Sequence, residues 1–161
     1  MEFQWHVVYT KPRWEKRVAC FLAKNEIENY CPLNRVVKQW SDRKKIVEEP
    51  LFTSYVFVRI NTRQQTKVRE TDGVLNFVHW LRKPAIIKNE EIDLIKRFLN
   101  EHINVKLERT RVKIDDRVRI MNGPFMEMEA NVIEVNTKTV RALIPSLGYV
   151  LTAEKENVKV I

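Results

Sequence analysis

The feature of this sequence that most limits its fold is a change of pattern near residue 110. Upstream, helix-like and strand-like segments alternate; downstream, only short strand-like runs recur, separated by turn sequences at 122–124, 136–138 and 146–148. Five short strands between residues 112 and 161 predict a small closed barrel. Residues 126–130, MEMEA, are compatible with a helix instead. Residues 102–111 have no clear periodicity, so we expect two domains, 1–101 and 112–161, joined by a linker at 102–111.

The first hundred residues read as a mixed α and β domain. Thr10 is expected to cap the first helix and Pro12 to lie in its first turn. The expected strands are 3–10, 27–33, a hairpin over 34–49, 51–60 and 74–80, and the expected helices run to about Glu26, over 62–71, and onward from Asn89. This order predicts an α+β protein whose first domain is a ferredoxin-like sandwich with a basic hairpin inserted.

The net charge of +8 is concentrated on a few segments. Residues 10–47 carry 10 basic and 4 acidic side chains. Such a surface attracts polyanions through contacts with phosphates, although a merely solvated surface gives the same pattern. The basic residues gather at the start of the first helix and at the hairpin tip: Lys11, Arg13, Lys16, Arg17, Arg43, Lys44 and Lys45.

Residue types that carry catalysis are sparse and scattered. The three histidines are far apart in the chain, and no Cys or His pair has the spacing of a metal site. Adjacent strand residues point to opposite faces, so Asp115 and Asp116 do not form a carboxylate pair. Cys20 and Cys31 read as small buried residues in a reducing cytoplasm. We expect no catalytic residue, metal, cofactor or membrane contact.

An aromatic face is the most informative local feature. In the strand 51–60, Tyr55 and Phe57 alternate with Val56 and Val58. The set with Val56 and Val58 is expected to meet the helices, and the set with Tyr55 and Phe57 to face away. Large aromatic side chains on the uncovered face of a two-layer fold indicate a docking surface, unless another part of the chain covers them. Tyr9 is expected on the same face if its strand is the neighbour.

Several motifs in this order resemble the NusG family of transcription factors. They are WHVVYTKPRWEKRV at 5–18, EPLFTSYVFVRI at 49–60, TDGVLNFV at 71–78 and PAIIKNEEI at 84–92. DRVRIMNGPF at 116–125 is similar to the start of a KOW domain, which implies an SH3-like barrel. The compact length and the basic hairpin are similar to the specialised UpxY and RfaH proteins, and LGYVLTAE at 147–154 is most similar to the UpxY group.

The resemblance implies a monomeric elongation or antitermination factor that binds RNA polymerase and reduces pausing or termination. The residues it assigns to the clamp helices of the largest polymerase subunit are Tyr9, Phe52, Tyr55 and Phe57. Upstream or non-template DNA would meet Lys11, Arg13 and Arg17. The charge pattern adds Lys16 to this set, together with Arg43, Lys44 and Lys45 at the hairpin tip. In relatives the KOW domain binds Rho or a small-subunit ribosomal protein. The alternative is an RNA- or ribosome-binding KOW module without polymerase docking.

Overall fold

The computed structural model describes residues 2–109, 132–135 and 139–154, and these fall into two compact units. The first unit comprises Met1–Pro32 and Phe52–Asn89, and the second comprises Leu33–Leu51 and Glu90–Ile161. The strands expected at 112–120 and 157–161, the pair Asp115 and Asp116, and the segment 126–130 lie outside the described residues. In the described part, no helix is long and apolar enough to cross a membrane.

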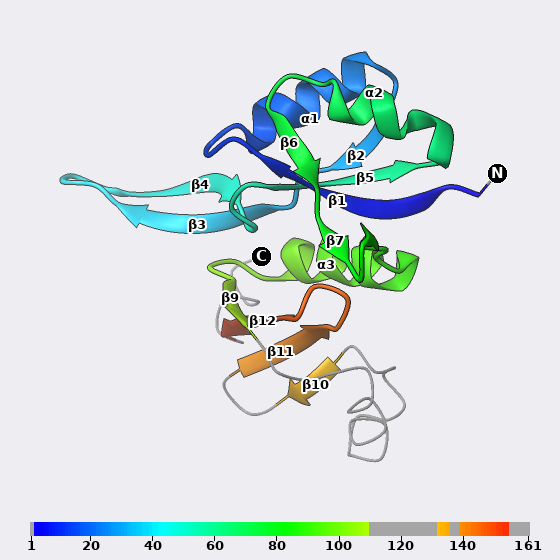
Figure 1. Ribbon diagram of the computed structural model, residues 1–161. Helices are drawn as coiled ribbons and strands as arrows, with labels where there is room; N and C mark the ends of the chain where they lie inside the picture. Colours follow the sequence, from blue (N-terminus) through cyan, green and yellow to red (C-terminus); the bar gives the residue numbers. More distant parts are fainter. Residues whose placement is uncertain (1, 110–131, 136–138, 155–161) are drawn as a thin grey trace. The chain divides into compact units, whose positions relative to one another are not determined.

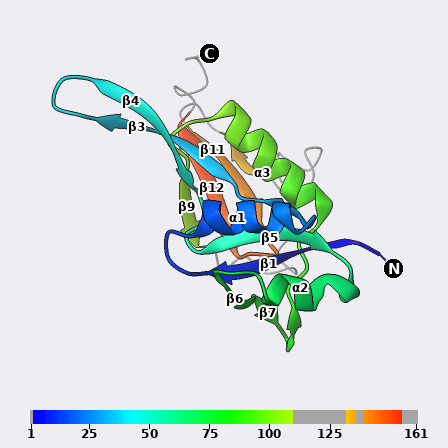
Figure 2. The ribbon, with the colours of Figure 1, turned by 90° about the horizontal axis from the view of Figure 1, so that it is seen from above.

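The first unit is a four-stranded antiparallel sheet with two helices on one face (Figure 1). Its strand order is β2-β5-β1-β6, with β1 and β5 in the centre. The elements are β1 Gln4–Thr10, α1 Glu15–Lys24, β2 Glu28–Tyr30, β5 Tyr55–Ile60, the 3-10 turn η1 Thr62–Gln64, α2 Gln65–Arg69, β6 Val74–Phe77, β7 His79–Trp80 and β8 Lys83–Pro84. Figure 2 shows α1 running alongside β5.

The alternation along β5 decides which face the helices cover. Val56, Val58 and Ile60 are buried in one core. Val18 and Leu22 of α1, Val68 of α2, and Val8 and Phe77 of the sheet complete that core. The register of β1 against β5 pairs Tyr9 with Tyr55 and Val7 with Phe57. Tyr9, Tyr55 and Phe57 therefore share the opposite face of the sheet, as expected from the alternation.

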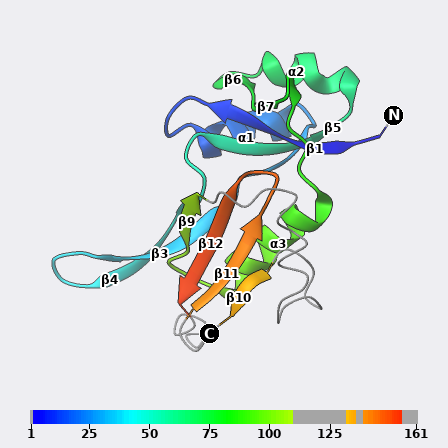
Figure 3. The same ribbon diagram turned by 60° about the horizontal axis from the view of Figure 1, so that its bottom comes forward.

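The second unit contains a long hairpin, one helix and a second sheet. Its elements are β3 Leu33–Gln39, β4 Lys44–Pro50, α3 Asn89–Glu101 (its first residue belonging to the first unit), β9 Lys106–Arg109, β10 Val132–Val135, β11 Thr139–Ile144 and β12 Tyr149–Glu154. The sheet order is β10-β11-β12-β9 (Figure 3). Gly148, with φ of 70°, lies in the tight turn between β11 and β12.

The apolar stripe of α3 and one of its carboxylates are buried. Ile92, Ile95 and Phe98 recur at helical spacing and are at most 4% exposed. Glu91, in the first turn, accepts hydrogen bonds from the backbone N–H and the hydroxyl of Ser146, at 3.0 and 2.5 Å. This pairing fixes the start of α3 to the turn that joins β11 and β12.

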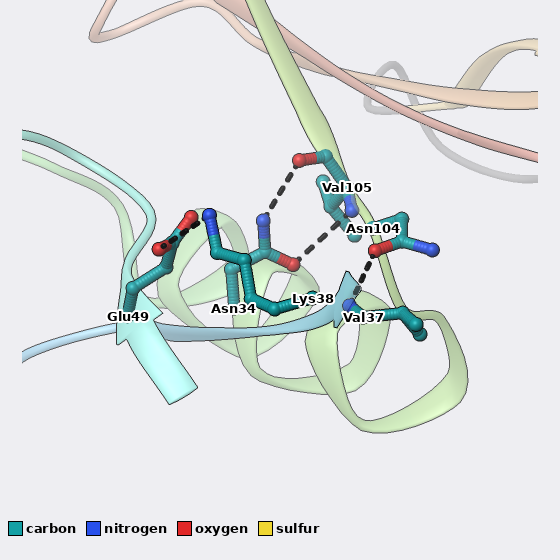
Figure 4. Close-up of polar contacts among 6 residues, drawn as sticks. All are labelled: Asn34, Val37, Lys38, Glu49, Asn104 and Val105. Carbon is teal, nitrogen blue, oxygen red and sulfur yellow. Dashed lines mark hydrogen bonds and ion pairs between the residues drawn. The ribbon is translucent and has the colours of Figure 1, made fainter. Parts of the chain in front are cut away.

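The base of the β3–β4 hairpin is held by a polar junction with the segment after α3 (Figure 4). The side chain of Asn34 donates to the Val105 carbonyl oxygen at 2.8 Å and accepts from the Val105 N–H at 3.1 Å. Asn104 accepts from the Val37 N–H at 2.9 Å through its side-chain oxygen. Because Asn34 is buried, its two bonds to Val105 satisfy polar atoms that water does not reach.

Three sequence predictions of element boundaries were wrong. Thr10 does not cap α1, because it is the last residue of β1 and pairs with Val74; the helix begins at Glu15 after Arg13, whose φ is 67°. The strand expected from residue 51 begins at Tyr55, because Ser54 has a φ of 62° that an extended strand excludes. Within the expected linker, Lys106–Arg109 form β9 and pair with β12. The sequence did not indicate this strand, because the segment contains a single apolar residue, Leu107.

Candidate functional site

Five aromatic side chains of the first unit form a connected cluster on the sheet face opposite α1 and α2. The aromatic cluster consists of Tyr9, Tyr30, Phe52, Tyr55 and Phe57. The rings of Tyr9 and Tyr55 meet edge to face, with centroids 5.4 Å apart. Phe52 stacks on Tyr55 at 6.1 Å and meets Phe57 edge to face at 5.6 Å. These separations lie in the range of favourable ring pairs.

Exposure changes steeply along the aromatic cluster. Tyr9 is 40% exposed and Tyr55 is half-buried, whereas Phe52 is 2% and Phe57 is 0% exposed. The expectation of an exposed Phe57 was therefore wrong: Phe52 and the half-buried Tyr30 lie against its ring. The accessible part of the cluster is the Tyr9–Tyr55 pair, and the phenylalanines lie beneath it as a packed support.

The loop that carries Phe52 is tied to α1 and to the end of β1. The backbone N–H of Ser54 donates to the buried carboxylate of Glu15 at 2.7 Å. The carbonyl oxygen of Ser54 accepts from the Thr10 N–H at 2.9 Å. These two bonds hold Ser54 in its left-handed conformation, which costs a non-glycine residue about 1–2 kcal/mol. Glu15 thus fixes the approach of Phe52 to Tyr55.

Cys31 lies next to the aromatic cluster in the chain and is not an activated nucleophile. Burial, and then the nearby Glu15 carboxylate, raise the pKa of the Cys31 thiol to about 11. A reactive cysteine needs the opposite shift, toward the thiolate at neutral pH. Burial also raises the pKa of the neighbouring Tyr30, so that phenol stays neutral. Among the described residues no group of three or more metal-ligating side chains occurs.

Two basic residues, one from the segment after β1 and one from the first turn of α1, lie against the indole ring of Trp14. The Lys11 ammonium lies 4.8 Å and the Arg17 guanidinium 4.5 Å from the Trp14 ring centroid. Both cations are exposed, as are Arg13 and Lys16. Trp14 in turn packs on Gly73: a Cβ at that position would lie 2.7 Å from the indole. The four predicted basic residues therefore share one surface, the basic turn (Lys11, Arg13, Lys16 and Arg17).

The tip of the β3–β4 hairpin in the second unit repeats this arrangement on a smaller scale. Trp40 is 44% exposed, with the Arg43 guanidinium 5.9 Å and the Lys45 ammonium 5.0 Å from its ring centroid. Arg43, Lys44 and Lys45 are all exposed. Cations stacked on an exposed indole keep their charge available to a polyanion.

Sequence reasoning identified the charged and aromatic residues but missed those that hold them. Glu15, Trp14 and Gly73 were not selected, although the spacing of Glu15 from Val18 and Leu22 placed it on the buried side of α1. Tyr30 was missed as a partner of Phe57. The expected aromatic residues of the first unit lie on the sheet face opposite the helices, and its expected basic residues lie on the turn that follows β1 and the first turn of α1.

A family model described as "Transcription termination factor nusG" matches residues 3–96 of this chain. The chain belongs to the NusG family. It is 30% identical to the transcription termination/antitermination protein NusG of Streptococcus pyogenes, over 94% of this chain and 92% of that protein. The Pseudomonas aeruginosa protein of the same name is 27% identical over 92% of this chain and 91% of its own length.

A solved structure agrees with the fold. The structure reporting a domain interaction in Thermotoga maritima NusG has a TM-score of 0.51, with 96% of this chain and 93% of that chain covered at 21% identity. It supports the mixed α and β architecture with several sheets. The family and its named members make this chain a transcription termination/antitermination factor.

Proposed function

We propose that this NusG protein docks on RNA polymerase through the exposed edge of the aromatic cluster. The observation that carries the proposal is the Tyr9–Tyr55 pair, two accessible rings 5.4 Å apart on adjacent central strands. Tyrosines at such positions are frequent interface anchors, because they present a large rigid ring and a hydroxyl that stays hydrogen-bonded. Phe52 and Phe57 support them from below.

The proposed partner surface is the pair of clamp helices of the largest polymerase subunit. The basic turn then meets upstream or non-template DNA, and Arg43, Lys44 and Lys45 of the hairpin tip extend that contact. Bridging the clamp and the edge of the bubble disfavours clamp opening, so pausing and termination decrease. No covalent chemistry takes place on this protein, which acts in the cytoplasm as a monomer.

The proposed domain plan is a ferredoxin-like domain over 1–101, a linker over 102–111 whose Lys106–Arg109 form β9, and a KOW barrel over 112–161. The strand order β2-β5-β1-β6 supports the first part, since a β-α-β-β-α-β unit gives this order once the hairpin is set aside. Rho or a small-subunit ribosomal protein is the proposed partner of the KOW domain. The basic hairpin supports a specialised, operon-specific member similar to UpxY or RfaH, and the LGYVLTAE segment at 147–154 is most similar to UpxY.

A co-purification experiment tests the docking proposal. Tagged full-length protein is incubated with purified core polymerase free of nucleic acid, and the Tyr9→Ala with Tyr55→Ala double variant is compared with the parent. We expect the parent to retain polymerase and the double variant to lose it while keeping the parental melting temperature. Parental retention by the folded variant would exclude this face. A parent protein that binds RNA or ribosomes but not polymerase would favour the alternative function, an RNA- or ribosome-binding KOW module.

A further inference from the structure

The short hairpin β7–β8, which follows the edge strand β6, presents large side chains that the fold does not use. Trp80 is 69% and Leu81 is 82% exposed, the two most exposed large apolar side chains among the described residues. Arg82 and Lys83 follow directly and are also exposed. The tip (Trp80, Leu81, Arg82 and Lys83) therefore combines an indole, an apolar side chain and two cations.

The backbone of the tip has positive φ angles at two residues, and neither of them is a glycine or an asparagine that would adopt such angles easily. Leu81 and Arg82 have φ angles of 52° and 68° and are the two loop residues between β7 and β8. Positive φ at both loop positions is the requirement of a type I′ hairpin, which favours Asn-Gly or Gly-Gly. Leu81 and Arg82 stabilise this turn less than Asn-Gly or Gly-Gly would, because side chains other than those of Asn and Asp rarely adopt a positive φ. Strain of this kind concentrates at functional sites.

The base of the same hairpin is rigidly anchored in the first unit. The Val78 N–H donates to the Val7 carbonyl oxygen at 2.8 Å, and the Ala85 N–H donates to Val78 at 2.8 Å. The buried imidazole of His6 donates from Nδ1 to the Ala85 carbonyl oxygen at 3.0 Å. Ile87, which is 1% exposed, completes the attachment by pairing with Trp5. An exposed tip on a fixed base loses little conformational entropy when it binds.

The charge around the tip selects the class of partner. Between Asp72 and Glu90 the sequence contains Arg82, Lys83 and Lys88 but no acidic residue. Among the described residues, neither Arg82 nor Lys83 makes an ion pair. An indole next to unpaired cations fits an unpaired nucleic-acid strand, whose bases stack on aromatic rings while its phosphates meet Lys and Arg. An apolar protein groove would leave both cations without a partner.

We propose that the β7–β8 tip is a single-strand nucleic-acid contact, in which Trp80 stacks on a base and Arg82 and Lys83 meet the flanking phosphates. This site is separate from the aromatic cluster and the basic turn and does not depend on polymerase docking. The shared chemistry is a base beside a phosphate, which both single-stranded DNA and RNA supply.

The test measures fluorescence anisotropy of labelled oligo(dT) and oligo(U), each about 12 nucleotides long, titrated with the full-length protein. We expect Trp80→Ala to weaken binding about tenfold, as loss of one stacked base does. Trp80→Tyr, which keeps an aromatic face, should stay within about twofold of the parent. Leu75→Ala, which truncates an exposed apolar residue of β6, is the matched control and should change nothing. The relative loss with the two oligonucleotides identifies the strand that the tip prefers.

Charge is tested separately through the salt dependence. Arg82→Gln with Lys83→Gln should lower the slope of log affinity against log salt by about 1.4, from about 0.7 for each phosphate contact with a single strand. Parental affinity in Trp80→Ala together with a parental salt slope in the Arg82 and Lys83 double variant would overturn the proposal. A parent that binds neither oligonucleotide would also overturn it. A Trp80→Ala protein that binds nucleic-acid-free polymerase less well than the parent would show a protein contact at the tip and would also overturn it.

Discussion

The carboxylate of Glu15 and the backbone N–H of Ser54 are joined by a 2.7 Å hydrogen bond between the first turn of α1 and the loop before β5. The loop carries Phe52, on which Tyr55 stacks at 6.1 Å. Glu15, on the helix-covered side of the first sheet, therefore positions Phe52 on the opposite side of that sheet. The bond also links the basic turn, which includes Lys16, to the proposed polymerase-binding surface.

The first prediction is that Glu15→Ala destabilises the protein by about 2 kcal/mol, since a buried hydrogen bond to a charged group is lost. The loop 51–54 should loosen, and polymerase binding should weaken with it. Glu15→Gln keeps an oxygen that accepts from Ser54 and should retain most of both properties. Urea unfolding and polymerase co-purification measure the two effects. Equal stability of the alanine variant and the parent would show that Glu15 does not hold the loop.

The second prediction separates the exposed from the buried members of the aromatic cluster. Tyr9→Ala and Tyr55→Ala should each cost about 2 kcal/mol of polymerase binding and little folding stability. Phe57→Ala should instead destabilise the fold by about 3–5 kcal/mol, because it leaves a cavity beneath the sheet. Calorimetric melting and polymerase titration distinguish the two effects. A Phe57→Ala protein as stable as the parent would contradict its placement in the core.

The central sheet was predictable because its strands carry strong local signals. The alternation in 55–60 placed Val56 and Val58 on the helical side, and that assignment is confirmed. The two-residue alternation of a strand could not show that Phe57 is buried, because it gives only the face on which a side chain lies. Covering a sheet face depends on side chains brought by other segments, and Phe52 and Tyr30 reach Phe57 from outside its strand.

Residues that hold the candidate site were harder to predict than residues that form it. Lys11 and Arg17 attracted attention by their charge, whereas Trp14 reads as an ordinary apolar helix residue in the sequence. Its role depends on Gly73, which is distant in the chain and close in the fold. Likewise, a lone glutamate such as Glu15 is usually solvated on a helix, and the hydrogen bond that it accepts from the Ser54 N–H depends on a loop that is distant in the chain.

The third prediction concerns the contact between Gly73 and Trp14. Gly73 has a φ of 89°, and a Cβ there would lie 2.7 Å from both the Trp14 and Val18 side chains. Gly73→Ala should therefore destabilise the protein by more than about 1 kcal/mol, through backbone strain and the displaced indole. Chemical denaturation measures the loss. As a control, Gly148→Ala changes a positive-φ glycine of the second unit and reports the stability cost of backbone strain without the Trp14 contact.

The fourth prediction concerns pH. Burial lowers the pKa of His6, and the same cause lowers that of His102. Because the folded state resists protonation of these imidazoles, the unfolded state binds more protons, so stability is complete above the unfolded pKa of about 6.5 and falls as pH drops below it. Melting temperatures between pH 7.5 and about 5 should decrease, and His6→Gln should reduce that decrease. If the melting temperature of His6→Gln falls with pH as much as that of the parent, the acid sensitivity comes from groups other than His6.

The fifth prediction tests the basic turn against a solvated surface. The Lys11 and Arg17 cations lie 4.8 and 4.5 Å from the Trp14 ring centroid, and Arg13 is also exposed, so all three charges are available to phosphates. If Arg13 and Arg17 each neutralise one duplex phosphate, replacing both with Gln should lower the slope of log affinity against log salt by about 1.8. The measurement is a salt titration of the polymerase-bound protein on a bubble scaffold. Arg59→Gln, which removes a cation already paired with Glu28, is the matched control and should keep the parental slope. An unchanged slope in the Arg13 and Arg17 variant would mean that these charges only solvate the surface, since salt affects binding in proportion to the phosphates neutralised.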